Sequence, residues 1–276
     1  MELKHILVPV DFSDCSVNAV RVAANLVNLY KGKLYLIHST QLPEAQVSVI
    51  GTFTPSVVPN LNAELEGAFD KLVEQVPDLE GLYYEVIESR GSLVDSLFTE
   101  VQTKQIDLIV MGTRSEHDKI EKLLGTHTAE VIEASNTAVL MIPSNQRVFN
   151  PERIGYAMDG KSITKVSSLG YISSITRMFS AKLEIFFIGK EGEFIDFEKN
   201  KGRGLMDRYF HDLDVSFTNM EDPNVNQGIL HFTKKNNIDL LVMIPRHHDL
   251  LHQLIKGSST KYVAQHLKIP LLALPE

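Results

Sequence analysis

The chain has 276 residues, 43% of them apolar, and a formal net charge of −8 at pH 7, which predicts two domains with a core each. The acidic balance disfavours a nucleic-acid partner, and no apolar run approaches the ~20 residues that span a bilayer. The single cysteine, Cys15, excludes an intramolecular disulfide, and the first residues lack a signal-peptide layout, so we expect a cytoplasmic protein with no membrane partner.

In the first half of the chain, short apolar runs alternate with segments of helical periodicity. The predicted strands are 6–10, 34–37, 83–87, 108–111 and 138–142, and the predicted helices lie near 14–30, 60–75, 92–105 and 125–136. Ser13 or Asp14 is expected to cap the first helix, and Ser92 with Asp95 resembles a capping pair. Strands that are apolar on both faces and separated by single helices predict an α/β fold with a parallel sheet covered on both sides.

The second half repeats this pattern, with strands predicted near 153–159, 182–188, 213–219, 239–244 and 270–274. Residues 107–111 (Asp-Leu-Ile-Val-Met) recur 132 residues later as 239–243 (Asp-Leu-Leu-Val-Met). A period this long indicates a duplicated domain, because solenoid repeats are roughly 20–50 residues long. We predict two tandem doubly wound domains of five mostly parallel strands each, a first repeat at 1–145 and a second repeat at 152–276, with a linker around 144–152.

Two further predictions concern a loop and the edges of the sheets. Residues 41–59, with three prolines, are an insertion in the first repeat and are predicted to form a long loop over one end of the sheet. The apolar runs 138–142 and 271–274 are predicted edge strands, and exposed edges are usually paired or covered. We expect the two domains to pair through these strands as a pseudo-dimer, while a homodimer of whole chains stays open.

Polar and glycine-rich segments follow several strands of the first repeat. Asp11 ends the first strand, 112–115 (Gly-Thr-Arg-Ser) follows the fourth, and 125–128 (Gly-Thr-His-Thr) opens the next helix. Ligands of open parallel sheets bind beyond the carboxyl ends of the strands. Free N–H groups at a helix start suit a phosphate, and Asp11 can accept hydrogen bonds from a ribose hydroxyl or an adenine amine. The alternative is structural: Asp11 caps the helix and the glycines only form turns.

These residues resemble the universal stress protein family, and the resemblance covers both halves nearly end to end. The opening 6–11 (Ile-Leu-Val-Pro-Val-Asp) followed by Ser13 is typical of that family's first strand and turn. ATP-binding members carry Gly, two residues, Gly, nine residues, and Gly with Ser or Thr. The first repeat has Gly112, Ser115 in place of the second glycine, and Gly125-Thr126 at this spacing. The resemblance implies a fold like that of the adenine nucleotide alpha hydrolases.

By that resemblance, the first repeat binds an adenine nucleotide. ATP is expected, with ADP or AMP as alternatives and Mg²⁺ as a companion of ATP. Asp11 and the end of the second strand near Ser39 are implied for the adenosine, and 112–115 with 125–128 for the ribose and phosphates. The residues implied for nucleotide binding as a whole are Pro9, Val10, Asp11, Ser39, Met111, Gly112, Arg114, Ser115, Gly125, Thr126, His127 and Thr128. In the second repeat Gly257-Ser258 survives, but Ile244 and His247 replace Gly112 and Ser115, so the same site is not expected there.

Two other patterns suggest chemistry that we do not favour. Residues 155–162 fit the P-loop pattern G-x-x-x-x-G-K-S with Lys161. A P-loop needs a buried strand before its first glycine, whereas the repeat alignment places Gly155 inside a strand. His248 and His252 are spaced to bind a metal from one helical face, although such histidines are more often solvated.

Three functional hypotheses therefore stand side by side. The first is a nucleotide-binding regulator of a stress response with little or no turnover. The second is an interaction or dimerisation scaffold that binds no nucleotide, and the third is a P-loop-type ATPase centred on Lys161.

Overall fold

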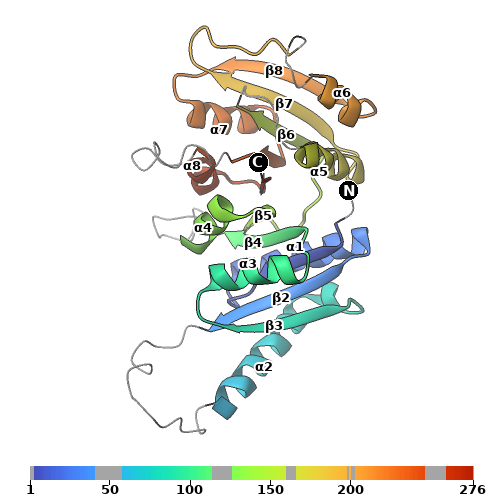
Figure 1. The fold of residues 1–276 in the computed structure, drawn as a ribbon, viewed down its shortest axis with the longest axis vertical. Helices are drawn as coiled ribbons and strands as arrows, with labels where there is room; N and C mark the ends of the chain where they lie inside the picture. The colour runs from blue at the N-terminus through green and yellow to red at the C-terminus, as the bar shows by residue number, and fades with distance from the viewer. Residues whose placement is uncertain are drawn as a thin grey trace. The chain divides into compact units, whose positions relative to one another are not determined.

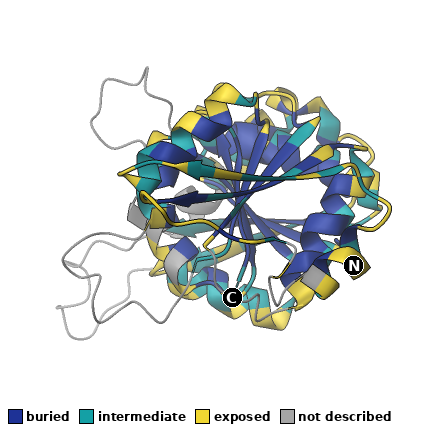
Figure 2. Cartoon of the chain, turned by 90° about the horizontal axis from the view of Figure 1, so that it is seen from above, coloured by how far each residue is buried: buried dark blue, intermediate teal, exposed yellow. Residues whose placement is uncertain are grey.

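The computed structural model describes residues 3–40, 58–113, 126–159, 166–197, 199, 203–245 and 259–275 (Figure 1). The chain divides into two compact units: a first unit, Leu3–Gly112, and a second unit that comprises Thr113–Glu276 with Met1–Glu2. Both units have the α/β architecture that the sequence predicts, with buried strands and helices that expose their outer faces (Figure 2). No helix among the described residues is long and apolar enough to cross a membrane.

The first unit has four parallel strands in the spatial order β3-β2-β1-β4. Its elements are β1 (His5–Pro9), α1 (Asp14–Tyr30), β2 (Lys33–Thr40), α2 (Val58–Gln75), a 3₁₀ turn (Pro77–Leu79), β3 (Tyr84–Arg90), α3 (Leu93–Thr103) and β4 (Leu108–Thr113). The central strand β1 is buried on both faces, as its continuous apolar run predicts.

The second unit has six strands in the order β5-β10-β9-β6-β7-β8. Its elements are α4 (Thr126–Ala134), β5 (Ala138–Pro143), β6 (Arg153–Met158), α5 (Val166–Met178), β7 (Lys182–Gly189), α6 (Arg203–Phe210), β8 (Val215–Glu221), α7 (Val225–Lys235), β9 (Leu240–Met243), α8 (Ser259–His266) and β10 (Leu271–Ala273). Strand β5 runs antiparallel to β10, with Leu140 opposite Leu272, while the other pairs are parallel.

The first and fourth strands of each repeat pair in the same register. Leu7 pairs with Ile109 between β1 and β4, and Gly155 pairs with Leu241 between β6 and β9. Gly155 therefore lies inside strand β6, as the repeat alignment predicts. A P-loop needs its first glycine after the strand, so this segment does not have the P-loop arrangement; Lys161 itself lies outside the described residues.

A repeated aspartate explains why the two first strands begin where they do. The Asp107 carboxylate accepts hydrogen bonds from the backbone N–H groups of Lys4 and His5, both at 2.9 Å. Asp239 accepts the corresponding bonds from Glu152 at 3.0 Å and Arg153 at 2.9 Å. The acidic residue that opens each copy of the repeated motif thus fixes the start of the neighbouring strand.

Local signals predict the starts of two helices in the first half of the chain. The hydroxyl of Ser13 caps α1 by accepting a bond from the Ser16 N–H, and Ser92 caps α3 by accepting one from Asp95, as predicted. The predicted loop 41–59 is wrong at its end, because α2 already begins at Val58. Pro59 is tolerated there because the first-turn N–H groups of a helix have no intrahelical partner. Residues 41–57 of the predicted loop lie outside the described residues.

The linker predicted at 144–152 belongs to the second unit and packs within it. Phe149 is only 8% exposed, and its ring lies edge-on to Phe179 with 5.5 Å between the centroids. The Gln146 N–H donates to the Pro143 carbonyl at 2.9 Å. The compact units divide the chain between Gly112 and Thr113, which describes compactness and not the bounds of the sequence repeats. The repeat bounds 1–145 and 152–276 therefore stay a prediction.

Candidate functional site

The candidate site begins at the carboxyl ends of β1, β2 and β4, three neighbouring strands of the first unit. Asp11 lies two residues beyond β1, Ser39 is near the end of β2, and Gly112 is near the end of β4. Carboxyl ends of parallel strands meet at one edge of a sheet, where open α/β sheets bind ligands. The structure therefore brings the adenosine residues implied by the sequence to the same edge.

Asp11 is part of the turn that starts helix α1. Its carboxylate accepts hydrogen bonds from the Ser13 N–H at 3.0 Å and from the Ser13 hydroxyl at 2.5 Å. Burial opposes the ionisation of Asp11, but the bonds from Ser13 and Ser16 favour the carboxylate, so the pKa of Asp11 lies below its ordinary value of 3.8. Asp11 thus supports the cap that Ser13 makes. An ionised carboxylate has about four acceptor sites, so Asp11 keeps capacity for a ligand.

The main chain of Ser39 faces the space beyond the end of β1. The Val10 N–H donates to the Ile37 carbonyl at 2.8 Å, so the peptide groups of Ile37 point towards β1. Because the direction of the peptide groups alternates along a strand, the N–H and C=O of Ser39 point to the same side as those of Ile37. The pairing of β1 with β2 ends at Pro9 and Ile37, so β1 does not extend as far as Ser39. The Gly91 N–H bonds to Thr40 on the opposite side at 3.2 Å. The N–H and C=O of Ser39 therefore present an adjacent donor and acceptor.

The side chains around this edge are mostly engaged in structure. The Ser39 hydroxyl donates to the Gly91 carbonyl at 2.9 Å, and Val10 and Met111 are 4% exposed. The Val10 carbonyl accepts a bond from Nδ1 of His38 at 2.7 Å. Pro9 is the last residue of β1 and is buried. These positions would meet a ligand through their backbone.

Gly112 has a packing role that the sequence does not reveal. A Cβ built on Gly112 would lie 2.1 Å from the carbonyl oxygen of Cys15 in the first turn of α1. Real Cβ atoms do not approach an oxygen so closely, so only glycine lets β4 run against this turn. The motif glycine is required here by helix packing, whether or not a phosphate binds nearby.

The residues predicted for the phosphates are described only in part. Arg114, Ser115 and Gly125 lie outside the described residues, and α4 begins at Thr126, so His127 belongs to its first turn. Thr128 is 6% exposed. In the part of the chain that the structure describes, no group of three His, Cys, Asp or Glu residues is placed to hold a metal ion, and His247, His248 and His252 fall outside that part.

The corresponding edge of the second repeat is built differently. Pro9 pairs with Ile37 and Ala157 pairs with Phe186, so Ile188 corresponds to Ser39. Ile188 is 5% exposed and packs on Gly228, where an added Cβ would come within 2.5 Å of Ile188 Cγ2. Strand β9 ends at Met243, before Ile244. Gly257 and Ser258 lie outside the described residues.

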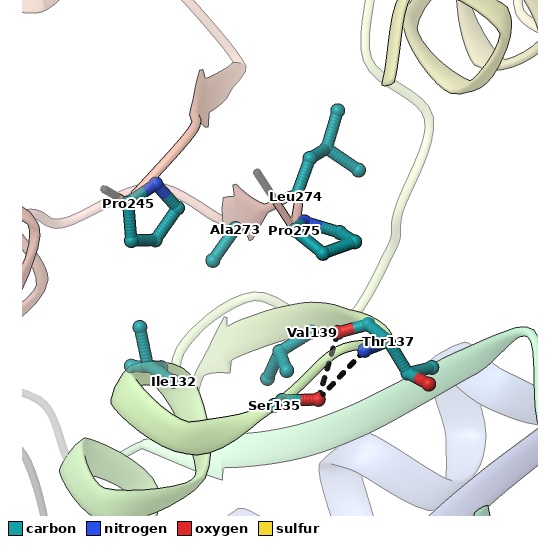
Figure 3. A pocket seen from close by; sticks show the side chains of 8 residues that line it. All are labelled: Ile132, Ser135, Thr137, Val139, Pro245, Ala273, Leu274 and Pro275. Carbon is teal, nitrogen blue, oxygen red and sulfur yellow. Dashed lines mark hydrogen bonds between the residues drawn. The ribbon is translucent and has the colours of Figure 1, made fainter. Parts of the chain in front are cut away.

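A separate shallow hollow, with no enclosed space for a water molecule, lies in the second unit beside the pair of strands β5 and β10 (Figure 3). Ile132, Val139, Ala273 and Leu274 form most of its apolar wall. Ser135 accepts a bond from the Thr137 N–H at 3.0 Å and donates to the Thr137 carbonyl at 2.8 Å. The residues that line the hollow include none that is predicted to bind nucleotide.

Comparison with known proteins identifies the family. The model of the universal stress protein family matches residues 2–143 and 209–275, and the chain belongs to that family. A universal stress protein from Archaeoglobus fulgidus DSM 4304 has a TM-score of 0.73 and 17% identity, with 100% of this chain and 97% of that chain covered. A putative universal stress protein from Pseudomonas aeruginosa UCBPP-PA14 has a TM-score of 0.66 and 16% identity, covering 99% and 93%.

Some of the similar structures cover only about half of this chain. A universal stress protein in complex with cAMP has a TM-score of 0.37 and 22% identity, with 52% of this chain and 100% of that chain covered. No curated protein matches the chain in sequence. The predicted fold class and family are confirmed.

Proposed function

We propose that the first repeat binds an adenine nucleotide, ATP in the first place, and that the protein is a stress-response regulator with little or no turnover. The observation that supports this proposal is the main chain of Ser39, whose N–H and C=O face the space beyond β1, near the end of the strand that leads to Asp11. The adenine edge carries an amine donor beside a ring-nitrogen acceptor, which complements one backbone C=O and one N–H. Guanine carries the opposite order on the same edge.

Asp11 supplies the second half of the recognition. Its pKa is lowered by hydrogen bonds from Ser13 and Ser16 against the opposing effect of burial, so the carboxylate is ionised at neutral pH. An ionised carboxylate accepts strong hydrogen bonds from ribose hydroxyls. The same lowered pKa makes Asp11 a weak general base, because efficient bases have a pKa near the working pH. Asp11 therefore suits binding better than proton abstraction.

The remaining parts of the proposal come from the sequence. Met111, Gly112, Arg114, Ser115 and 125–128 hold the ribose and phosphates, with Mg²⁺ accompanying ATP. The antiparallel register of β5 with β10 supports pairing of the two repeats through their last strands. Such pairing covers edges that would otherwise attract other chains.

Release of bound molecules from freshly purified protein tests the proposal. The protein is denatured, the supernatant is chromatographed, and ATP, ADP, AMP and cAMP are then titrated into the refolded or ligand-stripped chain by calorimetry. We expect adenine nucleotide near one per chain and weaker binding of GTP than of ATP. A chain that releases nothing and binds none of these ligands is the scaffold of the second hypothesis.

The variant Lys161→Ala distinguishes the proposed nucleotide site from a P-loop-type ATPase. Because Gly155 lies inside β6, this variant should bind nucleotide as the wild type does. A loss of tenfold or more, about 1.4 kcal/mol, together with loss of phosphate release, would instead support the ATPase.

A further inference from the structure

Phe12, between Asp11 and Ser13, has an unusual backbone conformation. Its φ is +60°, in the left-handed region that residues other than glycine rarely adopt. Asn, Asp and His are the non-glycine residues usually enriched there, and an aromatic residue is uncommon. Residues held in such a conformation persist where the surrounding contacts fix them, and they concentrate at functional sites.

The ring of Phe12 contacts two elements of the first unit, strand β2 and helix α2. It lies 5.0 Å from the ring of His38 at the end of β2, tilted by 41°, and 5.0 Å from Phe69 of α2, nearly perpendicular at 82°. His38 in turn donates through Nδ1 to the carbonyl of Val10 at 2.7 Å. Aromatic pairs at these separations are favourable beyond the area that they bury. The turn that contains Asp11 is therefore tied to both β2 and α2.

The second repeat provides an internal comparison. By the alignment of Asp11 with Asp159, Phe12 corresponds to Gly160, which lies outside the described residues. By the strand registers, His38 corresponds to Phe187. The second repeat therefore has glycine at the sequence position of Phe12, and its aromatic residue, Phe187, lies in the strand. In the first repeat a non-glycine residue with positive φ follows Asp11 and supplies the ring.

We propose that Phe12 is a positioning residue for the nucleotide site of the first repeat. Its contacts with His38 and Phe69 hold the Asp11 turn against the end of β2, so that the carboxylate of Asp11 and the main chain of Ser39 keep their relative position before a ligand binds. Preorganisation of this kind lowers the cost of ordering the site on binding. This inference rests on the proposed function, because it concerns the same ligand.

Three variants test this role. Phe12→Gly removes the ring but adopts positive φ freely, so it should keep a melting temperature close to that of the wild type while its affinity for ATP falls about tenfold. Phe12→Tyr keeps the ring and should restore wild-type affinity. Phe149→Leu is the matched control: it removes an edge-on aromatic pair with Phe179 within the second unit, and should lower the melting temperature without changing affinity.

Calorimetric titration of ATP well below each melting temperature distinguishes the outcomes. The positioning role is overturned if Phe12→Gly binds ATP as tightly as the wild type, or if Phe12→Tyr fails to rescue binding. It is also overturned if Phe149→Leu loses as much affinity as Phe12→Gly, because the loss then follows stability alone. A wild type that binds no nucleotide refutes the proposed function itself, and is recognised before any variant is compared.

Discussion

At Gly112 a single hydrogen atom occupies the space between strand β4 and the first turn of α1. A Cβ there would lie 2.1 Å from the Cys15 oxygen and 2.4 Å from the Cys15 carbonyl carbon, both of them backbone atoms that cannot rotate away. We predict that Gly112→Ala lowers the free energy of unfolding by ~3 kcal/mol or more, since forcing extra atoms into a packed core costs ~1–3 kcal/mol and occasionally more.

Gly67→Ala is the control for this prediction. Gly67 lies in α2, and a Cβ built on it meets nothing within 4 Å. Alanine there should stabilise the protein by ~0.5–1 kcal/mol, because glycine is the poorer helix former. Urea denaturation of both variants gives the comparison. Equal stabilities for Gly112→Ala and the wild type would show that β4 can move away from α1 at little cost.

Among elements, the repeated aspartates offer a matched pair of experiments. Asp107 holds the start of β1 and Asp239 holds the start of β6, each through two backbone N–H groups. Hydrogen bonds to a charged group contribute ~1.5–3 kcal/mol each. The two bonds of each carboxylate could contribute ~3–6 kcal/mol together, and solvent exposure reduces this sum, so Asp107→Ala and Asp239→Ala should each destabilise the fold by ~2–4 kcal/mol. The Asn variants, which keep an acceptor oxygen, should lose less.

Hydrogen exchange locates the effect. In Asp107→Ala the amides of Lys4 and His5 should exchange faster, while those of Glu152 and Arg153 stay protected; Asp239→Ala should give the reverse. Uniform loss of protection along the chain in either variant would contradict a local role for these carboxylates.

Helix α5 and the turn that follows α6 are joined by an ion pair between Arg177 and Asp212, and this pair has a testable pH dependence. Arg177 donates through Nε to Asp212 at 2.9 Å and also reaches the Tyr209 carbonyl at 3.0 Å. The hydrogen bond from Arg177 lowers the pKa of Asp212 from 3.8 to about 2. Because the folded pKa is the lower one, the stabilisation is complete above pH 3.8 and is lost as the pH falls towards about 2.

Asp212→Asn should accordingly melt below the wild type at pH 6, and the difference should shrink as the pH is lowered from 4 to 2. The pair is nearly half exposed, with side chains 43% and 46% accessible, so the effect should be small and should decrease with salt. A difference in melting temperature that is constant across this range would show that Asp212 contributes through packing and not through its charge.

For the molecule as a whole, the periodic parts of the fold were predictable and the non-local parts were not. The apolar runs located all ten strands, and the helix 14–30 was predicted at its observed bounds, because these signals are local. The packing of Gly112 on Cys15 depends on residues 97 positions apart, and the positive φ of Phe12 has no signal in its residue type. The sequence therefore predicted Asp11 and Ser39 for the candidate site, but it gave no reason to include Phe12 and His38, which the structure brings beside them.

The two repeats should differ in occupancy, with one nucleotide per chain held by the first repeat. Gly112 of the first repeat is replaced in the second by the β-branched Ile244, which cannot pack on a helix backbone as Gly112 does. Gly125→Val should add a β-branched side chain at the predicted phosphate-binding helix start, so affinity should fall by several kcal/mol. Gly257→Val should leave the stoichiometry unchanged in folded protein, which circular dichroism verifies. Two sites in the wild type by calorimetry would contradict the assignment of a single nucleotide to the first repeat. So would binding that survives Gly125→Val and disappears with Gly257→Val.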